Sequence, residues 1–242
     1  MSNGPQCQLT GNDSAHVWLV SLDLAADRIT ALRENLSPDE QSRCSRFVIQ
    51  KVSDRFIAAR GQLREILASY LSCAPTEIAF RYGQHGKPLL SHPPQTLLQF
   101  NLSHSGEYAL VAVTMHKAIG IDIEQLRRGR PLLKLAERFF SARETAELRN
   151  LPEQLQEDAF YACWTRKEAY LKAIGTGLAT PLNAFDVTLL PGVPPSLAAQ
   201  RLAPEETGRW QLVDIAVPGG YRGALAACRE MKTLLVRRWP LA

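Results

Sequence analysis

The stretch Gly120-Ile121-Asp122-Ile123-Glu124 is the part of the sequence from which the architecture can be worked out. In a β-strand alternate side chains share one face, so its isoleucines are expected in a core while Asp122 and Glu124 project together from the other face. Two adjacent carboxylates repel unless a cation joins them, and a hard divalent ion such as Mg²⁺ takes oxygen ligands of this kind. The pattern predicts a metal-binding strand or, as the alternative, a strand with one solvated polar face.

Strands and helices are expected on both sides of this stretch. Upstream, the Val- and Ala-rich run from Tyr108 to Thr114 predicts a neighbouring strand, joined to it by a turn at Met115 to Lys117. Downstream, apolar residues at helical spacing predict helices from Leu132 onward, including a long helix over Asp158 to Ile174. Further helices are expected from Ser37-Pro38 and over Asp54 to Leu71, and strands over 185–189, 210–217 and 224–228. The fold class is therefore α+β.

The bulk composition restricts the classes of function. The 242 residues are 45% hydrophobic and 21% charged, with a formal net charge of +4, as in an ordinary globular protein. This charge is too small for a dedicated nucleic-acid binder but favours acidic partners or phosphorylated ligands. The five cysteines are scattered without C-x-x-C pairs, and no apolar run approaches the roughly 20 residues of a membrane span. We expect a soluble cytoplasmic protein that binds neither membrane nor nucleic acid.

A second polar cluster lies on the long helix. Trp164, Glu168 and Lys172 are spaced four residues apart and share one stripe with Phe160. The ordinary interpretation is a surface Glu–Lys pair contributing about 0.3–0.5 kcal/mol. The alternative is functional, because a partly buried Glu168 must be paired or must bind a metal.

A third cluster, Asn101-Leu102-Ser103-His104-Ser105-Gly106, follows the apolar residues that start at Thr96. Adjacent Ser and His side chains on an extended chain point in opposite directions, and no G-x-S-x-G elbow is present, so a nucleophilic triad is not indicated. The hydroxyl, imidazole and backbone N–H groups could hold a phosphate, or the segment could be a polar turn.

Taken together, these clusters resemble the Sfp-type 4′-phosphopantetheinyl transferases. The resemblance rests on motifs in order along residues 37–190, namely Gly86-Lys87-Pro88, Asn101-Leu102-Ser103-His104-Ser105, Gly120-Ile121-Asp122 with Glu124, and Trp164-x-x-Lys167-Glu168-Ala169-x-x-Lys172. Arg138-Phe139-Phe140-Ser141 with Glu144, and Arg60-x-x-x-Arg64, are similar to the family as well. The resemblance implies a pseudo-twofold monomer of two similar α/β subdomains, residues 1–117 and 118–242, with coenzyme A between them.

The same resemblance implies roles for individual residues. Asp122, Glu124 and Glu168 would bind Mg²⁺, with Asp122, Glu168 and Lys172 forming the catalytic set. Glu168, directly or through a metal-bound water, would take the proton of the acceptor serine, and Lys172 would stabilise the departing adenosine 3′,5′-bisphosphate. Contacts to coenzyme A are implied at Arg43, Arg60, Arg64, Lys87, Pro88, Ser103, His104, Lys167 and Lys172.

The implied acceptors are apo acyl or peptidyl carrier proteins, which are acidic around the modified serine and would be steered to a basic surface. Residues 127–148, beside the metal strand, are the expected docking region. Two alternatives stay open at this point. One is a non-catalytic module that binds coenzyme A or a carrier protein, and the other is a different Mg²⁺-dependent phosphotransferase, although the chain has no Walker or Gly-rich kinase loop.

Overall fold

The computed structural model of the chain describes residues 7–240 and divides into two compact units. Of the described residues, 7–116 and 233–240 form the first unit, and Lys117–Lys232 form the second. Both units combine helices with mostly antiparallel sheet, so the predicted α+β class is confirmed. The C-terminal segment lies in the first unit, so a single boundary at residue 117 does not describe the division. Within residues 7–240, no helix has the length and hydrophobicity to cross a bilayer.

The first unit is built on a sheet of four strands in the order β11-β1-β5-β4. The strands are β1 (Ser14–Ser21), β4 (Leu98–Ser105), β5 (Tyr108–Met115) and β11 (Thr233–Trp239). β11 runs parallel to β1, and the other pairs are antiparallel. The central strands β1 and β5 are buried along almost their whole length. Strands from the two ends of the chain therefore pair in one sheet.

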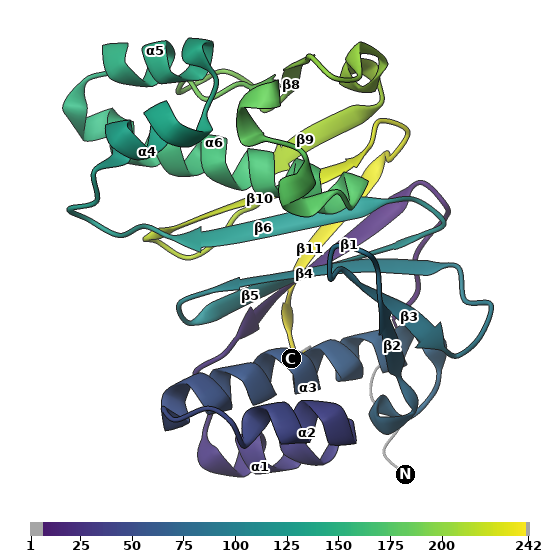
Figure 1. Cartoon of the computed structure of the whole chain (residues 1–242). Coiled ribbons are helices and arrows are strands. Elements are labelled where there is room, and N and C mark those ends of the chain that lie inside the picture. Colours follow the sequence, from purple (N-terminus) through teal and green to yellow (C-terminus); the bar gives the residue numbers. More distant parts are fainter. Residues whose placement is uncertain (1–6, 241–242) are drawn as a thin grey trace. The chain divides into compact units, whose positions relative to one another are not determined.

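Three helices and a hairpin complete this unit. The helices are α1 (Ala26–Glu34), α2 (Pro38–Cys44) and α3 (Gln50–Leu71), and α1 and α2 pack on the side of α3 away from the sheet (Figure 1). The hairpin pairs β2 (Ala79–Tyr82) with β3 (Pro88–His92). The core between α3 and the sheet is aliphatic and aromatic, with Trp18, Leu63, Ile66, Leu67, Phe100, Val111 and Val113 fully or almost fully buried.

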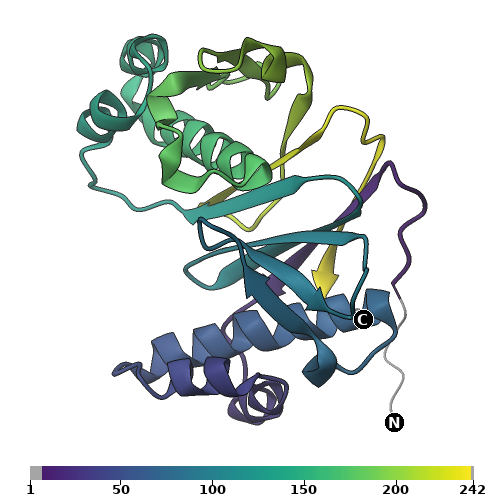
Figure 2. The ribbon, with the colours of Figure 1, turned by 45° about the vertical axis from the view of Figure 1, so that its right-hand side comes forward.

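The second unit places one long helix against a sheet of three strands. The sheet has the order β6-β10-β9, made of β6 (Ile119–Gln125), β10 (Tyr221–Cys228) and β9 (Trp210–Asp214). Helix α6 (Glu153–Ile174) lies across β6 and β10, as both views show (Figures 1 and 2). The remaining elements are α4 (Leu132–Phe139), α5 (Ala142–Asn150) and a short hairpin of β7 (Phe185–Val187) with β8 (Leu197–Gln200).

Two sequence expectations need correction, and several elements were not expected. The strand ending at Met115 and the strand beginning at Ile119 belong to different sheets in different units, so they are not neighbours joined by a turn. Residues 101–105 lie inside β4, and the turn begins only at Gly106, whose φ of 59° is favourable for glycine. The strands β1, β2, β3, β8 and β11 and the helix α1 were not anticipated from the sequence.

Candidate functional site

The contact between β6 and α6 positions the acidic residues of the second unit. Ile119, Ile121 and Ile123 are 0–1% exposed, as predicted for the core face of the strand. On the other face, a Cβ added to Gly120 would lie 2.1 Å from the carbonyl oxygen of Ala169 and 2.3 Å from the amide nitrogen of Ala173. Only glycine permits this approach of helix to strand. The Asp122 face of β6 is therefore covered by α6, and the interpretation as a solvated polar face is wrong.

Asp122 and Lys172 form an ion pair between β6 and α6. Lys172 Nζ lies 2.6 Å from Asp122 Oδ1, and the Asp122 side chain is 4% exposed while that of Lys172 is 28% exposed. Lys172 therefore reaches from the last turn of the helix to a buried carboxylate while keeping part of its surface accessible. This arrangement allows its ammonium group to interact with a bound anion as well.

Glu168 lies one helical turn before Lys172 and is electrostatically coupled to both acids of β6. Burial raises the pKa of the Glu168 carboxyl, and the charges of Asp122 and Glu124 raise it further, against the opposing effect of Lys172. Such a carboxylate accepts a proton more readily than an exposed one. Glu168 is half-buried and lies within electrostatic reach of Asp122, Glu124 and Lys172.

The three carboxylates have the donor chemistry that a divalent cation needs. Asp122 and Glu124 each raise the pKa of Glu168, so the negative charges of the three side chains act on the same small region. Carboxylate oxygens are ligands that suit Mg²⁺. Among residues 7–240, however, no three His, Cys, Asp or Glu side chains are already gathered in a metal-binding arrangement. The residue types fit the ion, and a bound ion would have to draw the side chains together.

In the first unit, Lys87 and Pro88 lie at the β2–β3 hairpin. The turn is closed by the N–H of Gly83, which donates to the carbonyl oxygen of Lys87 at 3.0 Å, and Gly86 has a φ of 77°. Pro88 opens β3. Burial lowers the pKa of the Lys87 ammonium group to about 8. Lys87 therefore keeps a positive charge at neutral pH but holds it in a partly desolvated position, which strengthens its attraction for an anion.

Ser103 and His104 occupy successive positions of β4, so their side chains point to opposite faces of the sheet. Ser103 is buried with Asn101 and Ser105, whereas His104 is exposed. Because β4 is at the end of the strand order, a ligand lying along this edge could contact both faces. The strand does not bring the two side chains onto one surface.

The structure gives Arg60 and Arg64 a partner that was not foreseen, the carboxylate of Glu40. Arg60 and Arg64 donate to Glu40 at 2.7 and 2.8 Å, and Arg64 also donates to the carbonyl oxygens of Pro75 and Ile78. The exposures are 3% for Glu40, 8% for Arg60 and 1% for Arg64. Both arginines therefore join α2 to α3 inside the unit.

Arg43 differs from these two arginines because its side chain is exposed. It lies on α2 with its guanidinium carbon 5.0 Å from the ring centroid of Phe56. Of the three arginines assigned from the family resemblance, Arg43 is the one whose position suits contact with a ligand from solvent.

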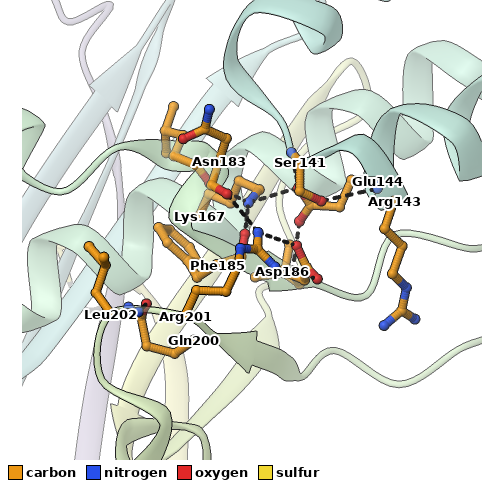
Figure 3. Close-up of polar contacts among 12 residues, drawn as sticks. Ser141, Arg143, Glu144, Lys167, Asn183, Phe185, Asp186, Gln200, Arg201 and Leu202 are labelled. Atoms are coloured by element: carbon orange, nitrogen blue, oxygen red, sulfur yellow. Dashed lines mark hydrogen bonds and ion pairs between the residues drawn. The ribbon is translucent and has the colours of Figure 1, made fainter.

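Lys167 is also placed differently from its expected role. It is 0% exposed, and its Nζ lies 2.8 Å from Glu144 Oε2 while donating to the carbonyl oxygens of Leu182 and Phe185 at 2.7 and 2.5 Å (Figure 3). An ammonium group has three hydrogens to donate, and three oxygens surround this one. The expected contact of Lys167 with coenzyme A phosphate is therefore corrected to an internal contact.

Two pockets lie in the second unit. One, of about 230 Å³, adjoins Glu124 and combines two arginines with three aromatic rings; it is lined by Glu124, Gln125, Arg127, Arg130, Leu135, Phe160, Tyr161 and Trp164. The other, of about 710 Å³, lies beside α5. The arginines of the larger pocket each form an ion pair with Glu147, Glu137 or Asp186, so their charge is already compensated. We assign the chemistry to the side of Glu124.

Comparisons with known proteins agree with this geometry. The family described as "4'-phosphopantetheinyl transferase superfamily" matches residues 118–226, and that described as "4'-phosphopantetheinyl transferase, N-terminal" matches residues 25–116. The 4′-phosphopantetheinyl transferase HetI of Nostoc sp. is 40% identical over 216 residues, which are 89% of this chain and 88% of that protein. The 4′-phosphopantetheinyl transferase Sfp of Bacillus subtilis is 33% identical over 155 residues, 64% of this chain and 66% of the relative.

A solved structure of a holo-(acyl-carrier-protein) synthase from Bacillus anthracis overlaps 46% of this chain and 94% of its own, with 23% identity and a TM-score of 0.37. The assignment rests on the sequence matches, which cover both units. The chain belongs to the 4′-phosphopantetheinyl transferase superfamily and is of the Sfp type.

Proposed function

We propose that this chain transfers the 4′-phosphopantetheine group of coenzyme A to a serine of an apo acyl or peptidyl carrier protein. The serine Oγ forms a bond to the phosphorus that bears pantetheine, the bond from that phosphorus to the bridging pyrophosphate oxygen breaks, and adenosine 3′,5′-bisphosphate leaves. The observation that carries the proposal is the arrangement of Glu168 and Lys172 on α6 against Asp122 of β6, in a chain of this family.

The proton of the acceptor serine is assigned to Glu168. A serine hydroxyl is a poor nucleophile while protonated, so a general base has to lie within reach of it. Glu168 lies on the same helix face as Lys172, and in the metal-free chain burial and the charges of Asp122 and Glu124 raise its pKa. Lys172, one turn further along α6, has the position and charge to stabilise the phosphate of the departing nucleotide.

Asp122, Glu124 and Glu168 are proposed to hold Mg²⁺. When bound, this ion would neutralise charge that builds up on the pyrophosphate during transfer. Binding it would also relieve the repulsion among the three carboxylates. Asp122 keeps its contact with Lys172 or exchanges it for the ion, and the accessible part of the Lys172 side chain allows either arrangement.

Coenzyme A is proposed to be bound in the first unit by the basic groups that remain exposed or half-buried there. Lys87 supplies a partly desolvated charge, His104 an exposed imidazole on the edge strand, and Arg43 an exposed guanidinium. Pro88 shapes the backbone next to Lys87, and Ser103 supplies a hydroxyl. Charge-assisted hydrogen bonds from these groups suit the phosphates of the nucleotide.

The carrier protein is proposed to dock at the pocket beside Glu124. Arg127 and Arg130 are exposed at its rim, and Phe160, Tyr161 and Trp164 supply apolar surface. This combination suits an acidic helix with an apolar side chain at its centre. Association should therefore weaken as salt screens the arginines.

Intact-mass spectrometry tests the proposal directly. An apo carrier protein is incubated with the enzyme, coenzyme A and Mg²⁺, and compared with reactions containing EDTA, Glu168→Ala or Glu153→Ala, the last an exposed acid in the first turn of α6. We expect a gain of one phosphopantetheine mass with the parent chain and Glu153→Ala, and none with EDTA or Glu168→Ala. Absence of transfer to both acyl and peptidyl carriers, with coenzyme A still bound, would support a non-catalytic binding module instead.

A further inference from the structure

We infer that Lys167 is a positioning residue that, with Glu144, sets the rotation of α6 and so presents Glu168 and Lys172 to Asp122. This inference rests on the proposed function. It replaces the direct contact with coenzyme A phosphate that the motif alone suggests. The basis is the closed set of polar contacts that surrounds Lys167 and Glu144 (Figure 3).

The Glu144 carboxylate joins three segments of the second unit. Oε2 accepts from the N–H of Ser141 at the start of α5 at 2.9 Å and lies 2.8 Å from Lys167 Nζ on α6. Oε1 accepts from the N–H of Val187 in β7 at 2.7 Å. Both Glu144 and Lys167 are 0% exposed. A buried pair of this kind has a narrow range of acceptable geometries, because any displacement leaves a charge without its partner.

The Lys167 ammonium group ties α6 to the segment that leads into β7. Its contacts with the carbonyl oxygens of Leu182 and Phe185 use the remaining hydrogens, and its Nζ lies 4.3 Å from the ring centroid of Phe185. Neighbouring Asp186 is held in turn by two hydrogen bonds from Arg201, at 2.8 and 3.0 Å. The segment that receives Lys167 is therefore itself fixed.

Helix geometry connects these contacts with the catalytic face. Successive residues of an α-helix are rotated by about 100°, so Lys167 and Glu168 project from different sides of α6. On the β6 side, Gly120 lets the helix backbone touch the strand. The contact at Gly120 limits the distance between α6 and β6, whereas Lys167 limits rotation of the helix about its axis. Both constraints act on Glu168 and Lys172, which lie next to these two points.

The test uses two variants that remove the buried charges. Lys167→Met keeps an unbranched side chain but leaves Glu144 buried without its cation, which destabilises strongly. The double variant Lys167→Met/Glu144→Gln removes both charges while keeping side chains of similar size. It decides the test if Lys167→Met alone does not fold. Arg149→Met is the matched control, because it removes an ion pair between α5 and α4 of the same unit without touching α6 or the segment that receives Lys167. The readouts are Tm, kcat, KM, the Kd for adenosine 3′,5′-bisphosphate without Mg²⁺, and a crystal structure of the double variant.

For the double variant we expect kcat to fall about 10- to 100-fold, as for misplacement of catalytic groups. The Kd for the nucleotide should stay within about threefold, and the 2.6 Å Lys172–Asp122 contact should be lost in the crystal. Arg149→Met should leave kcat unchanged, because its exposed ion pair with Glu137 lies away from Lys167.

Two results would overturn the inference. A loss of nucleotide affinity of about tenfold or more would mean that Lys167 contacts phosphate. An unchanged kcat with the Lys172–Asp122 contact intact would mean that the pair only stabilises the fold. If the parent chain modifies no carrier protein, the proposed function fails, and the crystal structure of the double variant still decides whether Lys167 positions α6.

Discussion

The ammonium group of Lys172 lies 2.6 Å from Oδ1 of Asp122, one of the three carboxylates proposed to bind Mg²⁺. A cation that binds there meets a positive charge already in contact with one of its ligands. Lys172→Met should therefore raise the affinity for a divalent ion by about fivefold to tenfold, about 1 kcal/mol at a partly exposed pair. The same change should lower kcat, because the departing phosphate loses its cation.

Binding of Mn²⁺, followed by electron paramagnetic resonance, measures this affinity without any requirement for transfer. Lys134→Met is a suitable control, since Lys134 is exposed on α4 of the same unit. Equal or weaker Mn²⁺ binding in Lys172→Met would show that the ion does not use Asp122.

Gly120 sets the spacing between β6 and α6. In Gly120→Ala the new methyl carbon would lie 2.1 Å from the carbonyl oxygen of Ala169, and backbone atoms cannot move aside as a flexible side chain can. We expect a loss of about 3 kcal/mol or more in the free energy of unfolding, at the upper end for overpacking, together with a loss of transfer. Urea denaturation measures the change, and Gly208→Ala, where a Cβ would meet nothing within 4 Å, should be nearly neutral.

Glu168 is held at a cost to stability. Its pKa is raised in the folded chain by burial and by Asp122 and Glu124, so ionisation is less favourable there than in the unfolded chain. Stability should therefore fall as pH rises from the ordinary Glu value of 4.5 through the raised pKa. Glu168→Gln removes this term, and we expect its Tm to exceed that of the parent by roughly 2–4 °C at pH 7 while transfer is lost. Calorimetric scans at pH 5 and pH 7 should show the difference growing with pH; a lower Tm at both values would contradict the assignment.

Local periodicity and capping signals were sufficient to predict the helices other than α1, and alternation along the strand was sufficient for the two faces of β6. The expected helix over 54–71 is α3, and the long helix over 158–174 is the C-terminal part of α6. The alternation of Ile and acidic residues in β6 predicted correctly which side chains enter the core. Glu168 and Lys172 were found at their helical spacing for the same reason.

What depends on distant partners was not predictable in this way. β1 pairs with β11 from the other end of the chain, and neither segment contains a motif that predicts this pairing. The sequence pattern indicated exposed or ligand-binding cations at Arg60, Arg64 and Lys167. Periodicity does not reveal that a buried carboxylate elsewhere in the sequence pairs with them. Ser141 and Glu144 form a capping box at the start of α5, and nothing in their spacing indicated that Glu144 also pairs with Lys167.

Lys87 gives a pH dependence to nucleotide binding if it contacts phosphate as proposed. Burial lowers the pKa of its ammonium group from 10.5 to about 8, so the free protein loses this positive charge as pH rises through that value. Affinity for adenosine 3′,5′-bisphosphate should accordingly fall between pH 7 and pH 9.5, by up to about tenfold. In Lys87→Arg the decline should disappear, because a guanidinium stays charged over this range. Titration calorimetry measures both, and an identical pH profile for the two proteins would remove Lys87 from the proposed contacts.

Glu40 is the anion on which the packing of α2 against α3 depends. Burial alone would raise the pKa of its carboxyl, but Arg60 and Arg64 outweigh that effect and hold the pKa below its ordinary value. Glu40→Gln leaves two buried guanidinium groups without their counter-charge, so we expect a loss of about 3–5 kcal/mol in the free energy of unfolding at pH 7. Glu34→Gln, at an exposed position of α1, is the control and should change stability by less than about 0.5 kcal/mol.

The acid limb of the stability curve gives Glu40→Gln a second, independent test. A carboxyl whose pKa is lowered by folding contributes stability that is present above its unfolded pKa, near 4.5, and is lost as pH falls through the folded value. The difference in unfolding free energy between the parent and Glu40→Gln should therefore be constant near neutral pH and shrink below pH 4.5. An equal difference at pH 4 and at pH 7, with no stability change in Glu34→Gln at either pH, would contradict this. It would mean that hydrogen-bond geometry, and not the ionised form of Glu40, accounts for the whole effect.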